Sequence, residues 1–144
     1  SQDKIHLPSP GSFTSEYAFN ATALHELSHA TGHPSRLDRD MGGFFSSSQY
    51  AYEELVAEMC SCFMGVNLDQ TASPDHINNH KAYVQSWIKA IRDKPETLIR
   101  AIKDAQSAAA FMDWKAGLIT DKEYSQTMNS TMEIATRSRD RDAR

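Results

Sequence analysis

The sequence has no hydrophobic run long enough to cross a membrane and no signal peptide at its N-terminus. A membrane-spanning helix needs about 18 or more consecutive apolar residues, and polar or charged side chains interrupt every apolar stretch well before that length. We therefore expect a protein that neither crosses nor binds a membrane. Because the chain begins with Ser1 rather than Met, we also expect it to be a fragment of a longer protein.

The sequence also lacks an excess of basic charge. It contains 15 Lys and Arg residues against 19 Asp and Glu residues, which gives a formal net charge of −4 at pH 7. Non-specific nucleic-acid binding depends on a strongly basic surface. We therefore expect that no nucleic acid is bound by this fragment alone.

Cysteine is scarce, which excludes a scaffold stabilised by several disulfides. The two cysteines, Cys60 and Cys62, are separated by one residue in a segment with helical periodicity. At that spacing their side chains point about 200° apart around a helix, so they do not readily share a disulfide or a metal ion. We expect both to be reduced thiols.

The residues that are present suit a compact, mainly helical domain. Of the 144 residues, 40% are hydrophobic, which is enough for a buried core. Alternating apolar residues over residues 3–7, followed by prolines, predict one short edge strand. Apolar periodicity and capping signals predict five helices, at about residues 15–31, 49–64, 74–91, 95–116 and 121–136.

The predicted fold is therefore α+β and predominantly helical, with a small N-terminal sheet remnant. We expect residues 1–117 to form the main domain and residues 118–144 to form a C-terminal helix and a charged tail. Gly32 is expected to end the first helix in a left-handed conformation, and Gly65 is expected to end the second. Gly117 is expected to end the fourth helix, and Thr120 with Glu123 forms a capping-box pattern before the fifth.

The chemistry is concentrated in the stretch ATALHELSHATGHPSRL, residues 21–37. His25 and His29 are four residues apart and so lie on one face of a helix, where both imidazoles can reach one Zn²⁺ ion. Glu26 follows the first histidine directly, and this offset places a carboxylate near the ion without making it a ligand. The pattern H-E-x-x-H thus supplies two metal ligands and a general base.

The alternative interpretation is that these residues only form a solvent-exposed polar face of a helix, with no metal site. The flanking residues Ala23, Leu24 and Leu27 instead indicate a helix that is buried on several sides. Burying two histidines in such surroundings is costly unless they have partners. The pattern therefore favours a zinc site.

A catalytic zinc site needs a third protein ligand. A histidine at the metzincin position is excluded because that position is Ser35, and His33 comes two residues too early. The segment YAYEELVAEM offers carboxylates instead. We expect Glu54 to be the third ligand and Glu58, one turn later, to accept a hydrogen bond from a ligand histidine, although the two roles could be exchanged.

The neighbouring Glu53 is predicted to face solvent. The group that stabilises the oxyanion is left open among five candidates, which are His33, His80, Tyr50, Tyr52 and Tyr83. A substrate in extended form could add to the edge of the strand predicted over residues 3–7.

The segments HELSHATGHPSRL, YEELVAE, AYVQSWIKAI and DAQSAAAFM, in this order and spacing, resemble the zincin-like metallopeptidase domain of plasmid antirestriction and polyvalent mobile-element proteins. The similarity covers about residues 3–112. It implies a fold with an active-site helix and a ligand-bearing second helix. It also implies a gluzincin-type zinc site formed by His25, His29 and a glutamate of the second helix, with Glu26 as the catalytic residue.

The function implied by the resemblance is zinc-dependent hydrolysis of a protein or peptide substrate in the bacterial cytoplasm. The larger protein would be an antirestriction or anti-defence protein of a plasmid, phage or other mobile element. In that family the domain usually follows a domain that binds single-stranded DNA, which a longer chain would have to supply. The alternatives are a non-catalytic zinc-containing module that binds DNA or a partner protein, and a purely structural zinc domain.

Overall fold

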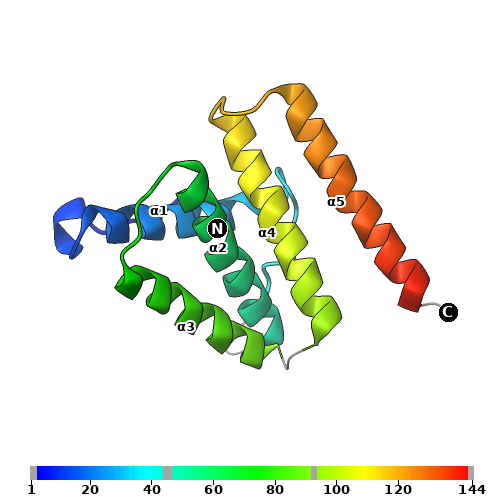
Figure 1. Cartoon of the computed structure of the whole chain (residues 1–144), viewed down its shortest axis with the longest axis horizontal. Coiled ribbons are helices and arrows are strands. Elements are labelled where there is room, and N and C mark those ends of the chain that lie inside the picture. Colours follow the sequence, from blue (N-terminus) through cyan, green and yellow to red (C-terminus); the bar gives the residue numbers. More distant parts are fainter. Residues whose placement is uncertain (1–2, 44–46, 92–93, 143–144) are drawn as a thin grey trace.

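The structure is a computed structural model that describes residues 3–43, 47–91 and 94–142, with side chains described as far as residue 133. A short 3₁₀ helix, η1, precedes five α-helices (Figure 1). Their bounds are η1 Pro10–Ser12, α1 Glu16–Thr31, α2 Ser48–Asn67, α3 Pro74–Ala90, α4 Pro95–Lys115 and α5 Asp121–Asp142. The five predicted helices are thus confirmed, and α5 extends through most of the segment predicted to be a charged tail.

The predicted N-terminal strand is wrong. Residues 3–7 form no strand, and none occurs anywhere in the described part of the chain. Ile5 and Leu7 are 39% and 38% exposed, and a single extended segment without a neighbouring strand cannot satisfy its backbone hydrogen bonds in a ladder. Asp3 is instead held by Arg36, whose guanidinium donates two hydrogen bonds of 3.0 and 2.7 Å to its carboxylate. The expected sheet-edge site for substrate therefore has no basis in this fold.

Helix α2 lies at the centre of the molecule and packs against α1, α3 and α4 (Figure 1). Its residues Leu55, Val56 and Cys60 are completely buried. The facing side of α4 is lined by small residues, among them the fully buried Ala101 and Ala105. Small side chains let the two helix backbones approach closely, and the well-packed contact fixes α2 in place.

Helix α5 packs along α4 (Figure 1). The ring of Trp114 stacks on that of Tyr124, with centroids 4.4 Å apart. Gly117 ends α4 with a φ of 74°, and Thr120 and Glu123 exchange the capping-box hydrogen bonds at the start of α5, so both of these predictions are confirmed. The division of the chain into residues 1–117 and 118–144 stays a prediction. Within the described residues, no helix is long and apolar enough to span a bilayer.

Gly32 and Gly65 do not act as predicted. Gly32 follows α1 with a φ of −79°, so its conformation is right-handed. The constraint at Gly32 is close approach, because a Cβ atom there would lie 2.7 Å from Sδ of Met41 and 3.0 Å from Nη2 of Arg39, and these side chains would have to shift. Gly65 lies inside α2, which continues to Asn67, and the left-handed residue after this helix is Asp69, with a φ of 54°.

These two glycines make a matched pair for a stability measurement. We expect Gly32→Ala to lower the free energy of unfolding by about 1–3 kcal/mol, because Met41 and the anchored guanidinium of Arg39 must move. Gly65→Ala meets nothing within 4 Å and should raise it by up to about 1 kcal/mol, since alanine favours a helix interior. Urea denaturation of both variants measures the two changes, and a loss of stability in Gly65→Ala would contradict this account.

Candidate metal centre

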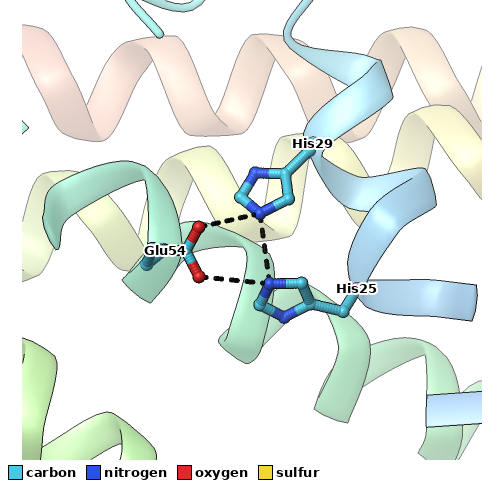
Figure 2. Close-up of side chains that lie close together, drawn as sticks. All are labelled: His25, His29 and Glu54. Carbon is cyan, nitrogen blue, oxygen red and sulfur yellow. Dashed lines mark hydrogen bonds and ion pairs between the residues drawn. The ribbon is translucent and has the colours of Figure 1, made fainter. Parts of the chain in front are cut away.

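Helices α1 and α2 bring His25, His29 and Glu54 together (Figure 2). Ser15 caps the start of α1 by accepting a hydrogen bond of 3.0 Å from the amide of Ala18. Further along α1, His25 and His29 project from the same face toward α2. Their Nε2 atoms lie 3.1 Å apart and 3.3 and 3.2 Å from the two carboxylate oxygens of Glu54.

These distances fit a zinc ion. An ion held at about 2.0–2.1 Å by ligands in tetrahedral directions separates those ligands by about 3.3–3.4 Å. The donor atoms of His25, His29 and Glu54 are 3.1–3.3 Å apart, and two imidazole nitrogens with one carboxylate form a donor set typical of catalytic zinc. The three side chains remain 17–23% exposed, so a fourth position can be reached from solvent.

Glu58 supports the ring of His25. Its Oε2 lies 3.2 Å from Nδ1 of His25, on the side of the ring opposite Glu54. The other oxygen, Oε1, contacts Nδ1 of His80 from α3. A carboxylate on Nδ1 favours the tautomer in which Nε2 is free to bind a metal.

Glu53 has the corresponding position behind His29, and the prediction that it faces solvent is wrong. It is only 6% exposed, and its Oε1 lies 3.2 Å from Nδ1 of His29. Arg39 covers the carboxylate and donates hydrogen bonds of 3.0 and 2.7 Å to its two oxygens. The guanidinium of Arg39 is itself anchored on α1, at the hydroxyl of Thr31 and the carbonyl of Ser28, both at 2.8 Å.

The structure separates the five oxyanion candidates. His33 lies beyond α1, where its Nδ1 pairs with the hydroxyl of Ser35 at 2.7 Å. Tyr52 donates a hydrogen bond to Asp104. His80 and Tyr83 line the same cavity as His25 and Glu54, and Tyr50 interacts with Glu54.

Tyr50 is a neighbour of the predicted ligand Glu54. Burial and the Glu54 carboxylate together raise the pKa of the Tyr50 hydroxyl. The Tyr50 ring packs edge-on against Trp87, with centroids 5.8 Å apart. Glu26, the predicted base, is partly exposed on α1, and its charge also acts on Tyr50. The phenol and both carboxylates therefore belong to one region.

A cavity of about 350 Å³ opens beside the site between α1, α2 and α3. His25, Glu54, His80 and Tyr83 contribute to its walls, and Tyr83 is 59% exposed. The cavity has room for part of a peptide next to the predicted ligands.

The protonation of the site depends on its own ion pairs. Although burial opposes a charged ring, hydrogen bonds to Glu54 and Glu58 raise the pKa of His25 to about 9. Burial likewise disfavours charged carboxylates, but their histidine partners lower the pKa of Glu54 and of Glu58 to about 2. Without a metal, the protonated imidazole rings form ion pairs with the carboxylates. A metal ion would have to displace the ring protons in order to bind.

Comparisons with known proteins agree with the geometry. A protein-family model described as a zincin-like metallopeptidase matches residues 1–104. The chain is 49% identical over 112 residues to a DNA primase TraC of Escherichia coli, a match that covers 78% of this chain and 10% of that protein. It is 37% identical over 114 residues to the uncharacterized protein y4eC of Sinorhizobium fredii, covering 78% of this chain and 36% of that protein. The chain thus spans only a minor part of these relatives. No solved structure matches it significantly.

We expect the metal-free protein to be most stable between about pH 4.5 and 6.5. The raised pKa of His25 contributes stability that is full below 6.5 and is lost as the pH rises to about 9. The lowered pKa values of Glu54 and Glu58 contribute stability that is full above 4.5 and is lost as the pH falls toward 2. His80, whose pKa hydrogen bonds with Cys62 and Glu58 raise to about 11, likewise contributes stability that is full below 6.5 and is lost as the pH rises toward 11.

Thermal unfolding after chelation measures this profile, with the zinc-loaded protein as the control. Zinc replaces the proton of His25, so its stabilising effect should grow from pH 6.5 to 9. A metal-free protein that becomes more stable over that interval would contradict the proposed ion pairs.

Proposed function

Because the chain belongs to the zincin-like metallopeptidase family, we propose that it is a zinc-dependent peptidase whose ion is held by His25, His29 and Glu54. The observation that supports this most strongly is the set of 3.1–3.3 Å distances among the three groups of donor atoms. Two residues outside this set, Glu53 and Glu58, would fix the two imidazole rings from behind.

Zinc, when bound, supplies Lewis-acid activation of water and of the scissile carbonyl. Glu26 accepts the proton of the attacking water and delivers it to the leaving amine. Its position directly after His25 on α1 places it beside the ligands without making it one of them. Because Glu26 is partly exposed, its carboxylate can meet water that enters the site.

Tyr50 is our candidate for stabilising the oxyanion that forms at the scissile carbonyl. Its hydroxyl is a neighbour of Glu54, and it lies within the electrostatic reach of Glu26. The raised pKa keeps the phenol protonated at neutral pH, as a hydrogen-bond donor must be. His33 and Tyr52 have other partners away from Glu54, which counts against them.

The substrate we propose is a protein or peptide, and the setting is an antirestriction or anti-defence protein of a plasmid, phage or other mobile element. Relatives named DNA primase TraC contain this segment as 10% and 7% of their length, which is consistent with a peptidase module joined to parts that act on DNA. With a net charge of −4, the segment would not bind nucleic acid by itself. A further domain would supply single-stranded-DNA binding, and the bacterial cytoplasm is the proposed location.

The second candidate function is a zinc-containing module that binds DNA or a partner protein without catalysis. The observation that leaves room for it is the size of the TraC relatives, in which another region can carry the activity that their name describes. Catalysis and binding make different demands on Glu26, since a module that only binds has no use for a general base.

Glu26→Gln separates these two functions. We expect it to lower the cleavage of a protein substrate by about 10²–10⁴-fold, because the amide cannot accept the proton of the attacking water. Bound zinc should remain at the wild-type level, because Glu26 is outside the proposed ligand set. Metal analysis and a cleavage assay on a panel of candidate proteins make the measurement, with His29→Ala as the control that loses zinc. Unchanged biological activity in Glu26→Gln would favour the binding module.

Tyr50→Phe tests the proposed oxyanion donor. We expect kcat to fall by about 10²-fold while KM and zinc content change little, because the lost hydrogen bond forms only as the reaction proceeds. Tyr52→Phe is the matched control, since its hydroxyl is bonded to Asp104 and its loss should leave kcat intact. An equal fall of kcat in both variants would exclude this role for Tyr50.

A further inference from the structure

A second group of metal-ligating side chains lies beside the first, between α2 and α3. It consists of Glu58, Cys62 and His80, and one potential ligand atom from each lies within 4.8 Å of the other two. Glu58 and Cys62 are four residues apart and share a face of α2, whereas His80 comes from α3. The construction repeats that of the first site, where a helix supplies two groups one turn apart and its neighbour supplies the third.

A contact outside this group, with Tyr17, helps to fix the ring of His80. Its Nδ1 faces Glu58, and its Nε2 lies 2.9 Å from the hydroxyl of Tyr17 on α1. The ring of Tyr17 is held in turn by stacking on His76, with centroids 4.1 Å apart. A histidine that binds a metal through one nitrogen usually has its other nitrogen fixed by such a partner.

The donor set distinguishes this group from an ordinary ion pair. A pairing of Glu58 with His80 alone would be explained by packing, but Cys62 adds a thiol whose sulfur lies within 4.8 Å of a potential ligand atom of each. Cys60 does not take part, because it is fully buried and its thiol faces Met112 at 3.9 Å. Thiolate, imidazole and carboxylate together suit borderline-soft divalent ions such as Zn²⁺ and Co²⁺ rather than Mg²⁺ or Ca²⁺.

We infer that Glu58, Cys62 and His80 form a second binding site for a zinc-like divalent cation. Binding displaces the proton of the Cys62 thiol and the Nδ1 proton of His80 to solvent. Three protein ligands leave a further coordination position, and the cavity lined by Glu58 and His80 gives access to it. Because Glu58 also contacts Nδ1 of His25, an ion here would be linked to the first site through a single carboxylate.

Cobalt titration of the chelated, reduced protein tests the second site without any peptidase assay. A thiolate bound to Co²⁺ gives intense near-ultraviolet charge-transfer absorption, which imidazole and carboxylate ligands do not give. The first site contains no sulfur, so this absorption reports on Cys62 alone. We expect two equivalents of Co²⁺ per chain and the charge-transfer band in the wild type.

Four variants identify the ligands. Cys62→Ser and His80→Gln should each lose the band and one equivalent of Co²⁺, whereas Cys60→Ser should keep both. His29→Ala should lose the other equivalent and keep the band, so failure of the first site is distinguishable from failure of the second. Circular dichroism verifies that each variant is folded. One equivalent in the wild type with no band, or a band that survives Cys62→Ser and His80→Gln, overturns the inference.

Discussion

The close packing of α1 on α2 is the contact on which the rest of this structure depends. Small residues make it possible. Ser28 is fully buried in the interface and returns its hydroxyl to the carbonyl of Leu24 at 2.6 Å. Ser61 on α2 donates to the carbonyl of Ala21 on α1 at 3.0 Å. Larger side chains at these positions would move the helices apart, and the imidazoles of α1 would no longer reach the carboxylates of α2.

That packing gathers three glutamates of one helix in a small volume and buries two of them, Glu53 and Glu58, which is costly for unpaired charges. Each carboxylate is tolerated because a cationic or protonatable group faces it. Glu53 has Arg39, Glu54 has the two histidines of α1, and Glu58 has His80. Each carboxylate faces two such groups, so the three glutamates and their partners form one connected network.

The sequence contained enough information to place the main features of this site but not the details behind it. Helical spacing alone put His25 and His29 on one face of the first helix, and Glu54 and Glu58 on one face of the second. The structure brings these four side chains together. The family predicted from the motifs is confirmed by the matched model. Metal binding and the catalytic role of Glu26 stay predictions.

The details that could not be predicted depend on the conformation of the loop that follows α1. The orientation of Glu53 is set by Arg39, and no periodic pattern marks a loop residue as the partner of a helix residue. The role of Gly32 likewise follows from contacts with residues 39 and 41. The strand expected over residues 3–7 failed for a related reason, because alternation indicates a strand only where another strand is available to pair with it.

The two carboxylates behind the histidine rings make the rings chemically unlike each other. The partner of His29, Glu53, is paired with the guanidinium of Arg39. The partner of His25, Glu58, is instead shared with His80, whose charge can be lost by deprotonation or replaced by an ion. The carboxylate behind His29 therefore has a fixed partner. The carboxylate behind His25 has a partner whose charge can change. A change in the charge of His80 would therefore act on the ring of His25, through the carboxylate that the two histidines share.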